Sequence, residues 1–156
     1  MMFSELDDEL AAPFALSIHL AALDSGCTSH AVMEIAVPEG AIVDTSRPTN
    51  IRTALNGASI HARGRSSSGI LEDFLVIGGN KLAKNLVSIP KLDRMGYTIT
   101  FRNGKGVVTN AQGNIITSAP LSKHDLYEFD IRQMFDTSTV APAAMLGSVD
   151  LPDADP

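Results

Sequence analysis

The chain has 156 residues and a mass of 16.5 kDa, which fits one ordinary domain with tails. Its hydrophobic content of 44% and charged content of 19% exclude a wholly disordered chain, and no apolar run approaches the ~20 residues of a membrane-spanning helix. The formal net charge is −6, but many acidic residues lie near the two ends, so the body is nearly neutral. We therefore expect neither a nucleic-acid partner nor a membrane partner for this domain.

The cysteine content points to a reducing, intracellular and cytoplasmic setting. Cys27 is the single cysteine, which excludes an intramolecular disulfide, and the sequence has no Cys/His cluster at zinc spacing. We expect no metal and no cofactor. The apolar stretch 14–23 is preceded by acidic residues and interrupted by His19, so we expect no secretory signal.

The first half of the chain predicts strands joined by tight loops. Residues 15–23 alternate loosely and predict a strand that ends at a loop beginning with Asp24. Residues 30–40 fit a short helix or a strand. The dipeptide Asn56-Gly57 is typical of a type I′ hairpin turn, because both of its central residues need positive φ. Residues 64–69 (GRSSSG) predict a flexible tip before a buried strand within 70–79.

The second half predicts one helix followed by a β-meander. Apolar residues recur at helical spacing after Asn85, with Ser88 as the N-cap and Gly96 as the stop. Strands should flank turns at Asn103-Gly104 and Gly113-Asn114. A last strand is expected over 127–131. Many short strands with one helix near residues 88–95 predict a mainly β fold, a small β-barrel.

One motif carries the chemistry. Asp24, Ser25 and Gly26 directly follow an apolar strand, as in the aspartic-protease signature. A carboxylate there can activate a water molecule, and a neighbouring hydroxyl can hold the loop by hydrogen bonding. The mechanism uses two carboxylates that share one proton, and the sequence has no second Asp-Ser/Thr-Gly. The second aspartate must then come from another copy, which predicts a homodimer with the site on its two-fold axis.

The wider sequence resembles the protease region of copia-type retrotransposon Pol polyproteins of the tobacco Tnt type. The resemblance covers residues 18–131 and rests on four blocks in this order: LDSGCTSH, NLVSIPKLDRMGYTITF, GKGVVTNAQGNIITSAP and DLYEF. Cys27 stands where this family usually has alanine, and cysteine is small enough to fit there. The sequence lacks the tryptophan that commonly precedes the motif in this family, and it has neither an upstream zinc knuckle nor a downstream Leu-Trp-His block.

The resemblance implies a retropepsin-like domain that processes its own Gag-Pol polyprotein, so that the substrate is a polypeptide. It implies an active loop of Asp24, Ser25 and Gly26. It also implies a substrate-binding flap, whose residues are Gly64, Ser66, Ser67, Ser68 and Gly69. An intact element would place the protein in a virus-like particle.

The expected domain organisation has three parts. Residues 1–14 form an acidic flexible tail, and residues 15–131 form the retropepsin-like domain. Within that domain, residues 97–131 resemble the start of the pre-integrase segment. Residues 132–156 are expected to form a second flexible tail.

The sequence allows two alternatives to a protease. Cys27 and His30 suggest a cysteine hydrolase, but they are three residues apart, whereas nucleophile and base normally come from distant parts of a fold. His30 is instead expected to be a structural histidine that hydrogen-bonds within the Asp24 loop. The second alternative is a non-catalytic β-barrel remnant or assembly module of a degenerate copia-type Pol polyprotein.

Overall fold

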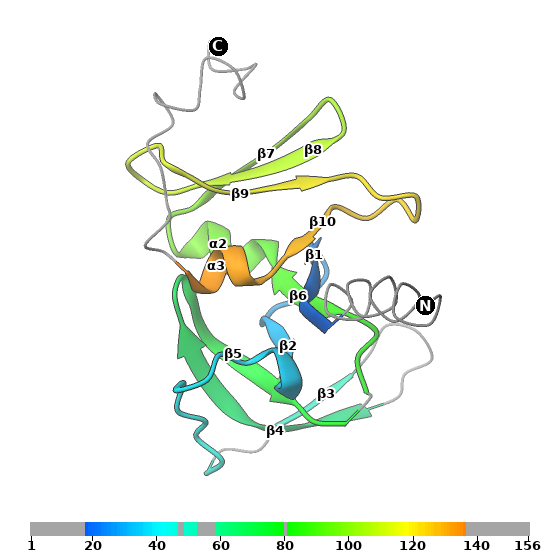
Figure 1. Cartoon of the computed structure of the whole chain (residues 1–156), viewed down its shortest axis with the longest axis vertical. Helices are drawn as coiled ribbons and strands as arrows, with labels where there is room; N and C mark the ends of the chain where they lie inside the picture. Colours follow the sequence, from blue (N-terminus) through cyan, green and yellow to red (C-terminus); the bar gives the residue numbers. More distant parts are fainter. Residues whose placement is uncertain (1–17, 47–48, 53–58, 80, 137–156) are drawn as a thin grey trace, which may run out of the picture.

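The computed structural model describes residues 18–46, 49–52, 59–79 and 81–136, and its fold is mainly β (Figure 1). The strands are β1 (Leu20–Asp24), β2 (Ala31–Met33), β3 (Thr49–Arg52), β4 (Ser59–Ser68), β5 (Leu71–Ile77), β6 (Asn85–Ser88), β7 (Thr98–Arg102), β8 (Lys105–Thr109), β9 (Ile115–Pro120) and β10 (Glu128–Asp130). The helices are the 3-10 turn η1 (Glu34–Ala36), α2 (Ile89–Arg94) and α3 (Arg132–Phe135). The predicted mainly β class is confirmed.

Seven strands form the larger sheet, in the order β10-β1-β6-β2-β5-β4-β3. Two of its pairings are parallel: β1 with β6, in which Asp24 faces Ser88, and β2 with β5. Parallel strands cannot be joined by a tight turn, so these pairings bring together segments that are far apart in the sequence. The pairing of β1 with β6 sets the position of the Asp24 loop.

The smaller sheet has the order β7-β8-β9 and is the predicted meander. Asn103 and Gly104 have φ of 54° and 75°, which gives the two positive values that a type I′ turn needs. Strand β8 pairs antiparallel with β9 across the turn at Gly113. Figure 1 shows this sheet stacked beside β1, β10 and α2.

One hydrophobic core joins the two sheets and the helices. Phe74 and Leu71 from β5, Leu92 from α2 and Met134 from α3 are fully buried, and they belong to one cluster with Val108 of β8. Burial of this kind stabilises the fold by about 1.5–3 kcal/mol for each large apolar side chain. The small sheet therefore belongs to the same folded unit as the Asp24 loop.

The strands of the expected small β-barrel do not close on one another in the described residues. In the described part of the chain, the larger sheet is open, with β10 and β3 at its edges, and β7–β9 form a separate sheet. The helix prediction is confirmed, because Ser88 Oγ accepts a hydrogen bond from Lys91 N at 3.1 Å and caps α2. The predicted hairpin around Asn56-Gly57 is supported by the pairing of Arg52 with Ser59, although the turn itself lies outside the described residues.

Two predicted segments have more regular structure than expected. Residues 64–68 were predicted to be a flexible tip, but they continue β4, where Arg65 and Ser66 pair with Leu75 and Phe74 of β5. Small polar residues have low strand propensity, and pairing with a buried neighbour overrides it. Residues 132–136 were assigned to a tail, yet α3 lies there and buries Met134 completely.

The remaining boundary differences are small. Strand β1 begins at Leu20 rather than at residue 15, and residues 15–17 lie outside the described part, as do the predicted tails 1–14 and 137–156. Within the described ranges, no helix is long and apolar enough to cross a membrane.

Candidate active site

Asp24 is the last residue of β1, and its carboxylate is held in place by the loop that follows. Oδ1 accepts a hydrogen bond from the backbone N–H of Gly26 at 2.7 Å, and Oδ2 accepts one from the Cys27 thiol at 3.0 Å. A Cβ atom on residue 26 would lie 3.3 Å from Oδ1, so glycine allows this close approach. Ser25 and Gly26 are exposed while Asp24 is half-buried, so a rigid strand presents the carboxylate at the surface.

The loop is anchored to the end of the neighbouring strand β6 by Ser88. Its Oγ donates to the carbonyl oxygen of Cys27 at 2.6 Å while it caps α2. Ser88 also faces Asp24 in the parallel ladder between β1 and β6. One hydroxyl therefore fixes the Asp24 loop to the start of α2. The sequence predicted the cap but gave no signal for the bond to Cys27, because the two residues are 61 positions apart.

His30 is structural, as expected, but its partner differs from the prediction. Its Nδ1 accepts a hydrogen bond from the backbone N–H of Ser88 at 2.9 Å, not from the Asp24 loop. The residue is fully buried, and its Nε2 has no hydrogen-bond partner among the described residues. Burial, and secondarily the charge of Lys91, lower the pKa of His30 from 6.5 to about 4. It is therefore neutral at physiological pH.

The geometry gives no support to a cysteine nucleophile. Burial, the hydrogen bond to Asp24 and the charge of Asp24 raise the pKa of Cys27 from 9.0 to about 12. A thiol acts as a nucleophile only as its thiolate. The acceptor nitrogen of His30 already accepts a hydrogen bond from Ser88, so His30 is not available as the base for Cys27. The thiol serves as a donor to Asp24 instead.

Asn85 is an organising residue that the sequence reasoning missed. It is fully buried in β6, where Oδ1 accepts from Met33 N at 2.7 Å and Nδ2 donates to the carbonyl oxygens of Ile18 and Leu20, each at 3.0 Å. These bonds tie β2 and the start of β1 to β6. The available signal was an asparagine inside an apolar strand, since buried polar side chains are normally hydrogen-bonded.

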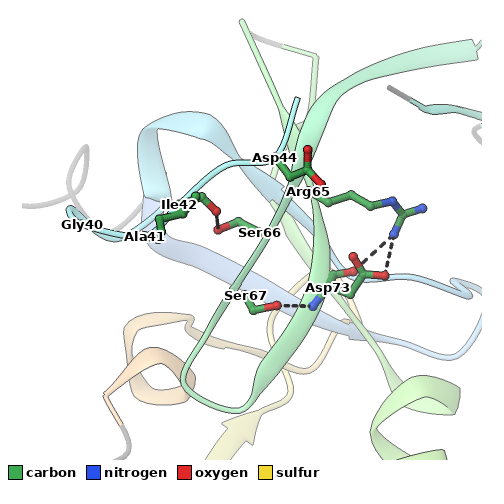
Figure 2. Close-up of a pocket in the computed structure, with 8 residues that line it drawn as sticks. All are labelled: Gly40, Ala41, Ile42, Asp44, Arg65, Ser66, Ser67 and Asp73. Carbon is green, nitrogen blue, oxygen red and sulfur yellow. Dashed lines mark hydrogen bonds and ion pairs between the residues drawn. The ribbon is translucent and has the colours of Figure 1, made fainter. Parts of the chain in front are cut away.

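The predicted flap residues lie in β4 and in the turn after it. Ser66 Oγ donates to the Ile42 carbonyl oxygen at 2.7 Å, and Ser67 Oγ accepts from Asp73 N at 2.8 Å. Figure 2 shows these contacts beside the ion pair of Arg65 with Asp73, which is 3.0 Å long.

Three of these residues line two surface grooves that do not include the Asp24-Ser25-Gly26 motif. Ser66 and Ser67 line a groove of about 470 Å³ with residues 40–42, whereas Ser68 lines a second groove of about 560 Å³ with residues 35–39 and α3. Asp24 lines neither groove. Gly64 packs against the backbone of Asp44, and Gly69 packs against the backbone of Met134 and Phe135. Neither of these two grooves therefore brings the predicted flap residues together with Asp24.

Among the described residues, no group of three or more His, Cys, Asp or Glu side chains is placed to hold a metal ion. Comparison of the chain with family models, with curated proteins and with solved structures finds no match. The fold and the Asp24 loop are therefore the observations on which a function has to be argued.

Proposed function

We propose that this chain is the aspartic endopeptidase domain of a retrotransposon Gag-Pol polyprotein and acts as a homodimer with one Asp24 from each copy. The observation that carries the proposal is the Asp24 carboxylate. It stands at the surface end of a buried strand, and the Gly26 N–H and the Cys27 thiol fix its orientation. General acid–base catalysis needs a carboxylate positioned in this way.

The proposed mechanism uses the two Asp24 side chains as a pair. They hold one water molecule and share one proton, because two carboxylates in close contact do not both ionise. The ionised member takes a proton from the water, which attacks the scissile carbonyl carbon, while the protonated member donates a hydrogen bond to the carbonyl oxygen. The proton then passes to the departing amine. Ser25 and Gly26 shape the loop around the pair.

The substrate in this proposal is an extended segment of the polyprotein that contains this domain. An extended peptide binds by adding a strand to a sheet, and pockets for its alternate side chains give specificity. The resemblance of the LDSGCTSH and NLVSIPKLDRMGYTITF blocks to copia-type Pol proteins supports a Gag-Pol substrate. Their positions support it as well, since one block forms the Asp24 loop and the other forms β6, α2 and β7.

The test is cleavage of a precursor in which this chain follows its upstream junction. Wild type is compared with Asp24→Asn, which keeps the size of the side chain and removes the ionisable group, at micromolar concentration and pH 5–7. Asp93→Asn is the matched control, because Asp93 is an exposed aspartate on α2. We expect cleavage by wild type and the control, and none by Asp24→Asn.

The concentration dependence separates a dimeric enzyme from a monomeric one. At concentrations below the dimer dissociation constant, the rate should rise with the square of the protein concentration. Absence of cleavage by a folded, dimeric wild type would favour the non-catalytic remnant or assembly module instead.

A further inference from the structure

Strand β7 is an open edge of the small sheet. In the order β7-β8-β9, all five residues of β7 pair with β8, and no strand within the described ranges pairs with its other side. An unpaired strand edge offers a row of N–H and C=O groups to another chain. The large sheet also ends in edge strands, but β7 has a second feature that distinguishes it.

Exposed apolar surface coincides with this edge. Phe101 of β7 is 44% exposed, although its ring packs against the Tyr127 ring in a tilted arrangement with 4.7 Å between the ring centroids. Ile99 points to the same face of the strand, because side chains alternate with a period of two. Ile99 packs against the hydrophobic core, so the exposed apolar surface at this edge is that of Phe101.

The β7 edge is close to the candidate active site. A Cβ atom built on Gly106 would lie 2.9 Å from the Phe101 ring and 3.1 Å from Leu23 Cδ1, so Phe101 and Leu23 meet over this glycine. The backbone N–H of Leu23 also donates to the carbonyl oxygen of Tyr127 at 3.0 Å. Leu23 immediately precedes Asp24. Phe101 of β7 therefore lies close to the residue that immediately precedes Asp24.

We propose that β7 pairs with β7 of a second copy of this chain, antiparallel about a two-fold axis at Thr100, and that this pairing joins the two copies into the dimer. The inference rests on the proposed function, because a site with one Asp24 in each chain is incomplete without the second copy.

The hydrogen-bonding pattern selects this register. The two-residue turn makes Arg102 and Lys105 a hydrogen-bonded pair, and in an antiparallel ladder such pairs alternate with non-hydrogen-bonded ones. The backbone N–H and C=O groups of Ile99 and Phe101 therefore point to the free edge. Pairing Ile99 with Phe101 of the second copy uses all four groups of each strand edge. Shifting the two strands by one residue pair would leave some of these backbone groups unpaired or would require the backbone N–H of Tyr97 as a partner. That N–H already donates to the Leu92 carbonyl oxygen.

The side chains across this register are compatible. Thr100 lies opposite Thr100 of the second copy. Ile99 lies opposite its Phe101, and Thr98 lies opposite its Arg102, so no like charges oppose each other. Thr–Thr and aromatic–β-branched pairs are favourable across antiparallel strands. The pairing also covers the exposed part of Phe101. These features select a second copy of this chain as the occupant of the edge.

The register is tested by disulfide trapping in the full chain. Residues 100 of the two copies form a non-hydrogen-bonded pair, whose Cα atoms are about 4.5 Å apart, and this separation allows a disulfide. In a Cys27→Ala background, we expect Thr100→Cys to give a covalent dimer under air oxidation, read by non-reducing electrophoresis. Thr98→Cys is the matched control, because its position faces Arg102 of the second copy and should remain uncrosslinked.

A second variant tests the interface without oxidation. Thr100→Lys places two ammonium groups opposite each other at the axis, and sedimentation should show a dimer dissociation constant raised at least tenfold. Ser118→Lys, at an exposed position of β9, should leave the dissociation constant unchanged. A dimer that neither crosslinks through residue 100 nor weakens with Thr100→Lys overturns the β7 interface. A protein that stays monomeric at 100-micromolar concentration overturns it as well.

These results also separate the interface from the catalytic proposal. Crosslinking through residue 100 without any cleavage that depends on Asp24 supports the interface and contradicts the protease. Cleavage that depends on Asp24, without crosslinking, supports the protease and contradicts this interface.

Discussion

The backbone N–H of Ser88 donates a hydrogen bond to Nδ1 of His30, which lies 58 positions earlier in the chain. This bond requires Nδ1 to be the acceptor, so the neutral ring carries its proton on Nε2. Protonation at Nδ1 would turn the acceptor into a second donor facing an N–H group. The bond between these residues therefore holds only while the imidazole is neutral.

His30 should make stability depend on pH. Its pKa is lowered from 6.5 to about 4 in the folded chain, so between these values the unfolded chain binds more protons. Stability is therefore full above pH 6.5 and falls as the pH drops towards 4. We expect a loss of about 2 kcal/mol between pH 7 and pH 5, measured by urea unfolding. His30→Gln should be less stable at pH 7 and should lack this pH dependence. If stability depended on pH in the same way in the variant, the pH dependence would belong to groups other than His30.

The Cys27 thiol should react slowly with alkylating reagents. With its pKa raised to about 12, the thiolate fraction at pH 8 is about a thousandfold below that of an ordinary thiol of pKa near 8.5. Asp24→Asn removes the negative charge and the carboxylate acceptor, which are two of the three causes, while burial remains. The reaction rate with iodoacetamide should therefore rise in this variant and stay below that of the unfolded protein. Equal rates in both folded proteins would contradict the contact between Cys27 and Asp24.

Asn85 should be important for stability although it lies outside the Asp24 loop. Asn85→Ala leaves the Met33 N–H and the Ile18 and Leu20 carbonyl oxygens without their partner, and each unsatisfied buried group costs about 1–3 kcal/mol. We expect a total loss of at least about 3 kcal/mol in chemical unfolding. Asn50→Ala, at an exposed position, serves as the control and should change stability by less than about 0.5 kcal/mol. Similar losses in the two variants would contradict the role given to Asn85.

Gly69 should tolerate no side chain. Its φ is 57°, and a Cβ atom there would lie 2.2 Å from the Met134 carbonyl oxygen and 2.6 Å from that of Phe135. Gly69→Ala therefore combines backbone strain with displacement of α3. Gly113→Ala is the matched control, since φ is 84° and nothing lies within 4 Å of its Cβ position. Thermal unfolding should show a drop of several degrees more for Gly69→Ala than for the control.

Local patterns predicted much of this fold, while tertiary pairing decided the rest. The Ser88 cap, the stop at Gly96 and the turn at Asn103-Gly104 depend on neighbouring residues only, and all three are present. Strand β4 was missed at residues 64–68 because its pairing with β5 outweighs the composition of that segment. The mainly β class was predicted correctly, but the described strands form an open sheet with a smaller sheet beside it, because strand number and alternation do not determine which strand lies beside which.

The candidate site divides in the same way. The Asp24-Ser25-Gly26 motif was visible as a string of residues, and the structure adds how Gly26 and Cys27 orient the carboxylate. The hydrogen-bond partners of Ser88 and Asn85 could not be predicted from the sequence, because these partners lie far away along the chain. The predicted flap residues rest on composition and resemblance. The contacts of Ser66 with Ile42 and of Ser67 with Asp73 join separate segments, so no local sequence pattern could predict them.

The bond between Ser88 and Cys27, 61 positions apart, also sets the order in which the site can form during synthesis. Strand β1 leaves the ribosome first, but it has no parallel neighbour until β6 and the start of α2 have followed. Domains fold as their elements become available during translation, so the Asp24 loop reaches its final shape only after most of the domain has been made.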